Sequence, residues 1–156
     1  MATAAVSLTS IALAVHVAAV VVAFGPLFAY PVLLAAVRRA DPSALPAVYR
    51  AQHAVARTVI TPALPLTLIA GMYLAAEEHA FGRAWVVVPM VALVVLMALH
   101  RFVLIRGYRR LADLGSQDVA AAEGKRGGVA ARVDHAQLLA AGLVVFTIYV
   151  MAAKPF

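Results

Sequence analysis

The sequence contains no cysteine among its 156 residues, which excludes disulfides, thiolate metal sites and cysteine nucleophiles. Charged residues are also scarce, because they make up 13% of the chain, against about a quarter in soluble domains. Hydrophobic residues make up 65%. A soluble fold of this length cannot bury so much apolar surface, so lipid must solvate part of it. The composition therefore predicts an integral membrane protein with a single domain, residues 1–156.

Four apolar stretches, together with their flanking helical extensions, are long enough to cross a bilayer, which takes roughly 20 residues of helix. They predict an all-α, four-helix transmembrane bundle with the spans listed at the end of this paragraph. The first stretch has no charged segment before it and is followed by similar stretches, so it is predicted to be a span and not a signal peptide. The polar, Gly- and Ala-rich stretch 115–128 predicts a flexible cytoplasmic loop. The predicted spans are about 9–37, 46–76, 84–112 and 130–153.

Basic residues are distributed unequally between the two ends of the predicted bundle. Eleven lie in the segments that join the first span to the second and the third to the fourth, whereas Arg83 and Lys154 lie at the other end. Because basic residues mark cytoplasmic loops, both termini are predicted to lie outside the cytoplasm. The same pattern accounts for the net charge of +6, so the expected partner is the lipid bilayer and no nucleic acid. A homodimer is a further hypothesis, which no motif fixes.

Ionisable side chains inside a membrane are costly and are therefore candidates for function. His16 lies roughly 8 Å below the outer end of the first span, and Met90 in the third span lies at a similar depth. Imidazole and thioether groups are axial ligands of haem, so this level predicts a haem site. The alternative is ordinary bundle packing, with a histidine that forms a hydrogen bond between helices.

A second level of histidines is predicted near the cytoplasmic boundary, where His53, His100 and His135 belong to three different helices. His100 lies about 22 Å below the outer end of its span and some 14 Å below His16, so one haem iron cannot bind both. Three histidines at one level predict a metal site that suits zinc or copper. Histidines that face lipid headgroups are the alternative interpretation.

Arginines flank these histidines and favour an anionic group over a metal cation. Arg57 precedes Thr61 and Pro62 at the mouth of the second span, and Arg101 follows His100. An arginine here suits a haem propionate, a lipid phosphate or a small anionic ligand such as a porphyrin. The alternative is that Arg57 extends to the interface. The spans contain no nucleotide-binding loop, Ser-His-Asp spacing or paired carboxylates, so hydrolase and NTPase activities are not predicted.

Several motifs follow one another along nearly the whole chain. His16 is followed by Phe24-Gly25 and by Leu27, Phe28 and Pro31; residues 57–63 read R-T-V-I-T-P-A; His100 closes the third span; and the last three residues are K-P-F. In this order they resemble the HemJ-type protoporphyrinogen oxidase family, and the chain is similar to the bacterial four-helix membrane proteins near that family and the copper-resistance D proteins. The resemblance implies a haem ligand at His16 and a multi-pass protein of the bacterial inner (cytoplasmic) membrane.

One position departs from that family: Pro89 stands where the family has a lysine, a proposed second haem ligand. Met90 is next to this position and is a candidate substitute. We therefore predict a haem-b-binding membrane protein with a redox role, an oxidoreductase if it is an enzyme, in which His16, Met90 and Arg57 contact the cofactor. Two rival hypotheses stay open: a small transporter or channel component for a metal ion, which uses the three lower histidines, and a non-catalytic membrane scaffold.

Overall fold

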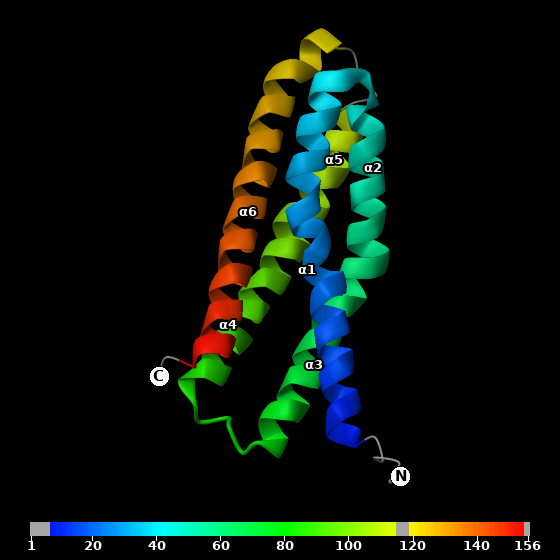
Figure 1. Ribbon diagram of the computed structural model, residues 1–156. Helices are drawn as coiled ribbons and strands as arrows, with labels where there is room; N and C mark the ends of the chain where they lie inside the picture. Colours follow the sequence, from blue (N-terminus) through cyan, green and yellow to red (C-terminus); the bar gives the residue numbers. More distant parts are fainter. Residues whose placement is uncertain (1–6, 115–118, 155–156) are drawn as a thin grey trace.

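The computed structural model describes residues 7–114 and 119–154, and every regular element in them is helical. The helices form four long rods that run side by side (Figure 1). Short 3-10 or π-helical segments divide two of the rods into several elements that follow one another without a gap. The elements are α1 (Leu8–Ala40); η1 (Pro42–Ala44), α2 (Leu45–Val55), η2 (Ala56–Ile60) and α3 (Thr61–Glu77); α4 (Ala84–Leu99), η3 (His100–Leu104) and α5 (Ile105–Leu114); and α6 (Val119–Ala153).

Each rod is long and apolar enough to cross a membrane. The four candidate spans contain 33, 36, 31 and 30 residues, and a helix of about 20 residues already crosses a hydrocarbon core of about 30 Å. The predicted four-helix membrane bundle is therefore confirmed, and the ends of the rods extend beyond the hydrocarbon. The spans predicted from the sequence all lie within these rods.

The fourth rod begins earlier than the sequence pattern indicates. Residues 119–128 belong to helix α6, so the predicted loop 115–128 is too long; its residues 115–118 lie outside the described residues. The segment 119–126 is rich in alanine and also contains glutamate, lysine and arginine, which are strong helix formers. Each glycine in this stretch costs about 1 kcal/mol relative to alanine in a helix, and this cost does not interrupt α6.

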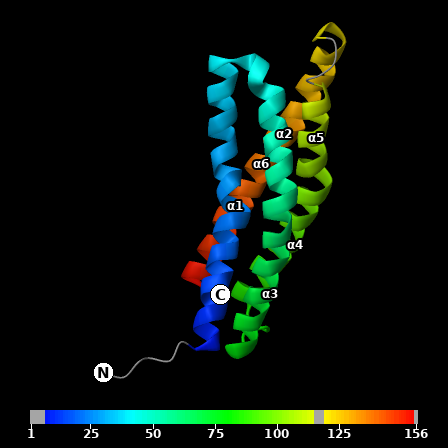
Figure 2. The same ribbon diagram turned by 90° about the vertical axis from the view of Figure 1, so that its right-hand side faces the viewer.

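The two ends of the bundle differ in what they carry. Helix α1 begins and α6 ends at one end, beside the connection between α3 and α4 (Figure 1); we call this the terminal end. At the other end, the loop end, α1 passes through η1 into α2, and α5 ends near the start of α6. Helix α1 packs on α3, α4 on α6, and α2 on α5, as the side view in Figure 2 shows for α2 and α5. Which end faces the cytoplasm stays a prediction.

The second and third rods both widen into one π-helical turn, at η2 and η3, and a hydrogen bond joins these turns. Nε2 of His100 donates to the carbonyl oxygen of Ala56 at 3.2 Å, and the Thr61 hydroxyl donates to the same oxygen at 2.8 Å. Pro62, which follows directly, has no N–H to donate within its helix. The carbonyl oxygen of Ala56, the Thr61 hydroxyl and one ring nitrogen of His100 are thus paired inside the bundle, as the membrane interior requires.

Candidate functional site

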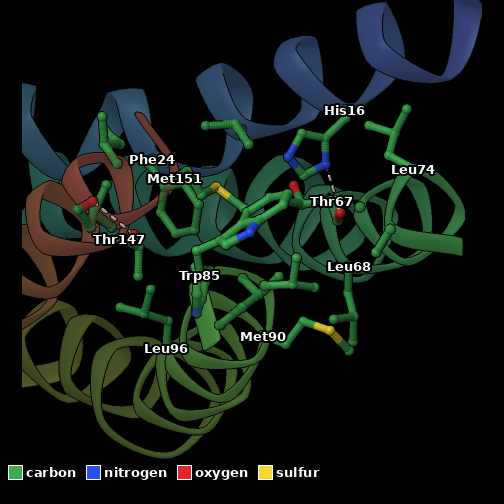
Figure 3. A pocket seen from close by; sticks show the side chains of 18 of the residues that line it. His16, Phe24, Thr67, Leu68, Leu74, Trp85, Met90, Leu96, Thr147 and Met151 are labelled. Atoms are coloured by element: carbon green, nitrogen blue, oxygen red, sulfur yellow. Dashed lines mark hydrogen bonds between the residues drawn. The ribbon is translucent and has the colours of Figure 1, made fainter. Parts of the chain in front are cut away.

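An apolar cavity of about 260 Å³ lies between α1, α3, α4 and α6, toward the terminal end. Apolar cavities between helices, with a few polar groups in the lining, are typical ligand sites. Figure 3 shows side chains from all four helices around this space. Its lining includes His16, Phe24, Thr67, Trp85, Met90 and Met151.

His16 is held in one tautomer by a bond to the backbone of α3. Its Nδ1 lies 3.0 Å from the carbonyl oxygen of Thr67, marked by the dashed line at His16 in Figure 3. A carbonyl oxygen only accepts hydrogen bonds, so Nδ1 carries the proton and donates it. In the neutral imidazole, Nε2 then keeps a free lone pair. This arrangement, with one ring nitrogen bound to a backbone carbonyl, is the usual one for histidines that ligate metals.

The imidazole of His16 lies directly against the backbone of α3. A Cβ atom built on Gly71 would lie 3.0 Å from Cε1 and 3.3 Å from Nδ1 of His16. Gly71 stands four residues after Thr67, so both lie on the same face of α3. The imidazole ring therefore lies in the space that a side chain at position 71 would occupy, and it donates a hydrogen bond to the carbonyl of Thr67.

Met90 is also in the lining of this cavity, on α4, next to Pro89. The two side chains that the sequence places at one depth, His16 and Met90, therefore enter one cavity from different helices (Figure 3). Arg57, the third predicted cofactor contact, is exposed on η2 and does not line this cavity.

Sequence reasoning missed the charged group near the terminal end of the cavity. Nζ of Lys154 lies 4.3 Å from the centroid of the Trp85 ring, a cation–π contact, and Trp85 lines the cavity. Glu78 is in the lining as well. The signal was weak, because Trp85 and Lys154 are far apart in the sequence and residues of both types are common at membrane interfaces.

The three lower histidines differ in their surroundings. His100 is buried, His53 is half-buried and His135 is exposed. Nδ1 of His135 donates to the carbonyl of Ala131 in its own helix at 2.6 Å. Among the side chains that the structure describes, in residues 7–114 and 124–154, no group of three or more His, Asp or Glu is placed to hold a metal ion. The structure therefore gives no support to a metal site made of these histidines.

Buried polar side chains occur in the half of the bundle nearer the loop end, and sequence reasoning passed over them. Nε2 of Gln137 donates to the Tyr108 hydroxyl at 2.7 Å, and both residues are buried. The Tyr30 hydroxyl and the Gln52 amide have no partner in the part of the chain that the structure describes. The signal available in the sequence was the presence of Gln52 and Gln137. A polar side chain is costly to expose to lipid, so a glutamine in a spanning segment indicates a position that faces other helices.

A small second cavity of about 30 Å³ lies in this region. Its lining includes Tyr30, His100 and Tyr108. Phe24 and Leu96 line both cavities and lie between them. The small cavity exceeds the roughly 10–15 Å³ that one water needs, and polar groups are available in its lining.

Comparison with known proteins gives one clear relationship. No curated protein and no solved structure matches the chain. A family model described as a predicted integral membrane protein, DUF2269, matches residues 10–155, which include all four rods except the first two residues of α1. The match carries no link to the HemJ-type or copper-resistance D proteins. The chain belongs to the DUF2269 family of predicted integral membrane proteins.

Proposed function

We propose that this membrane protein binds haem b in the cavity near the terminal end and has a redox role, with His16 as an axial ligand of the iron. The observation that carries the proposal is the hydrogen bond from Nδ1 of His16 to the Thr67 carbonyl at 3.0 Å. It leaves the lone pair of Nε2 available in an apolar cavity. A neutral imidazole held by its other nitrogen is the form that ligates iron.

The chemical character of the cavity lining supports the proposal. Its surface is apolar and contains the aromatic rings of Phe24 and Trp85, which suit a flat macrocycle. The contact between His16 and Gly71 holds the imidazole against α3. Binding of the cofactor therefore does not carry the entropy cost of ordering the imidazole. Met90 supplies a thioether in the same lining, and a histidine with a methionine is a known axial pair that raises the reduction potential of haem.

The charged groups favour Lys154 over Arg57 as the partner of a propionate. Lys154 lies over Trp85 near the terminal end of the cavity, whereas Arg57 is not in the lining. An ammonium group near the interface can pair with a carboxylate that remains partly hydrated. A bound haem would supply one-electron chemistry, and the apolar lining of the cavity would keep water away from its ring.

The test is an absorption spectrum of the full chain, produced with a haem supply and purified. We expect a Soret band in the wild-type protein and its loss in His16→Ala. His135→Ala is the matched control, because His135 is exposed, bonds to its own helix and does not line the cavity. A colourless wild-type protein rejects haem binding and favours the scaffold hypothesis, whereas a Soret band that His16→Ala leaves unchanged rejects His16 as the ligand.

A further inference from the structure

A separate cavity of about 500 Å³ lies at the loop end, between the end of α5 and the first turns of α6. It shares no lining residue with the proposed haem cavity. Its described lining contains three basic side chains, one carboxylate and two apolar side chains, in addition to Gly124 and Gly128. These residues are Arg110, Lys125, Arg132 and Asp113, with Leu114 and Val129.

The charge in this cavity favours an anionic ligand. Arg110, Lys125 and Arg132 are all exposed, so their charged groups are available to a ligand. They outnumber the carboxylate of Asp113 by three to one in the described lining. Guanidinium groups bind phosphate through two parallel hydrogen bonds. The two arginines can therefore hold a phosphate in a defined orientation, which a diffuse positive charge cannot do.

Two glycines of α6 provide the space. Gly124 and Gly128 are one helical turn apart and both line the cavity. A Cβ atom built on either would meet no other atom within 4 Å in the part of the chain that the structure describes. The hollow therefore has room in front of the α6 backbone, and a large side chain at either position would occupy it without a change in charge.

We propose that this cavity binds the phosphate group of an anionic phospholipid. The cavity lies at the end of a transmembrane bundle, where lipid phosphates are the most abundant anions, and basic pockets between transmembrane helices are known to bind such headgroups. Leu114 and Val129 in the lining suit the glycerol and the upper acyl carbons. Further along α6, Leu138 and Leu139 are 75% and 71% exposed and offer an apolar surface for lipid chains.

The experiment is a lipid titration of the full chain in detergent, read out by thermal unfolding and by native mass spectrometry of retained lipid. The probes are phosphatidylglycerol, phosphatidylcholine and inorganic phosphate. We expect saturable stabilisation and retention with phosphatidylglycerol and neither with phosphatidylcholine. If inorganic phosphate binds as tightly as phosphatidylglycerol, the ligand is a free anion and the assignment to lipid is overturned.

Paired variants separate a formed site from a diffuse charge effect. Arg110→Gln and Arg109→Gln change the net charge equally, but only Arg110 lines the cavity. We expect Arg110→Gln to weaken phosphatidylglycerol binding about tenfold, as the loss of a hydrogen bond to a charged group does, and Arg109→Gln to have little effect. Equal weakening by both variants would overturn the proposal.

A steric pair tests the cavity itself. Gly128→Leu fills the hollow and leaves the charge unchanged, whereas Gly142→Leu places the same side chain on an exposed position of α6 far from the cavity. We expect only Gly128→Leu to abolish lipid retention. If Gly128→Leu fails to fold, Gly124→Leu fills the same space. Lipid retention that survives a folded cavity-filling variant rejects the site.

Discussion

A Cβ atom on Gly71 would lie 3.0 Å from Cε1 of His16, which is closer than nine in ten real Cβ contacts. The contact joins α1 to α3 at the level where the Thr67 carbonyl accepts the bond from Nδ1 of His16. The backbone of α3 therefore sets both the position and the tautomer of the imidazole. Gly71 and the Thr67 carbonyl thus orient the His16 ring through the backbone of α3, without a functional side chain of their own.

Gly71→Ala is expected to displace the imidazole and to weaken its bond to Thr67, because the new methyl group overlaps the ring edge. Disturbance of such a supporting contact lowers metal affinity by about 10- to 100-fold, so haem affinity should fall by about tenfold or more while the helical content is retained. Haem titration followed by the Soret band measures this. Gly25→Ala is the control, since a Cβ there meets nothing within 4 Å in the described structure; equal loss in both variants would contradict the role of Gly71.

Met90→Leu tests the second axial position. The substitution nearly conserves volume but removes the thioether, which stabilises ferrous haem. We expect the reduction potential to fall by on the order of 0.1 V, within the range of about 0.8 V that axial ligands cover. A redox titration of the haem bands provides the measurement. Met72→Leu, at an exposed position of α3 outside the cavity lining, should leave the potential unchanged, and an unchanged potential in Met90→Leu would exclude the thioether as a ligand.

The sequence predicts the depth of a residue in the bundle much better than the direction in which its side chain points around the helix axis. Apolar length defines each span, and the rise per residue then gives depth; in this way His16 and Met90 are assigned to one level, and the structure places both in one cavity lining. His53, His100 and His135 are also assigned to one level, but they differ in burial and are not grouped around a metal position. Rotation about each helix axis decides which residues meet, and small differences in packing determine that rotation.

Features of the backbone leave almost no trace in the sequence. The carbonyl of Thr67 would be the same for any residue, and Gly71 is one of 9 glycines, most of which have open space where a Cβ would stand. The contact of Lys154 with Trp85 joins the end of the fourth rod to the start of the third. These elements of the site depend on the assembled bundle, so only the structure reveals them.

The close approach of α5 and α6 depends on Gly107. A Cβ atom on Gly107 would overlap Cγ2 of Val133, and both residues are buried. Gly107→Ala is therefore expected to destabilise the bundle by about 1–3 kcal/mol, the usual cost of overpacking. Chemical or thermal unfolding in detergent measures the loss.

Val133→Ala tests whether the contact with Val133 causes the loss of stability in Gly107→Ala. It removes the methyl group that the new side chain would meet, so the double variant should be more stable than the sum of the two single effects indicates. Gly142→Ala serves as the control in an open helical position, where alanine should be neutral or slightly stabilising. Strict additivity of Gly107→Ala and Val133→Ala would show that the two positions do not interact.

The buried hydrogen bond from Gln137 to Tyr108 offers a test of polar pairing within the bundle. The donor and the hydroxyl are 2.7 Å apart, and each residue is 2% exposed. Gln137→Leu leaves the Tyr108 hydroxyl without this donor, and Tyr108→Phe leaves the amide of Gln137 unpaired, so each single variant should lose about 1 kcal/mol. The double variant removes both polar groups and should recover most of the loss, because two apolar side chains carry no desolvation cost. Unfolding free energies of the four proteins give the coupling directly, and a coupling near zero would mean that water or another group satisfies the Tyr108 hydroxyl when Gln137 is replaced.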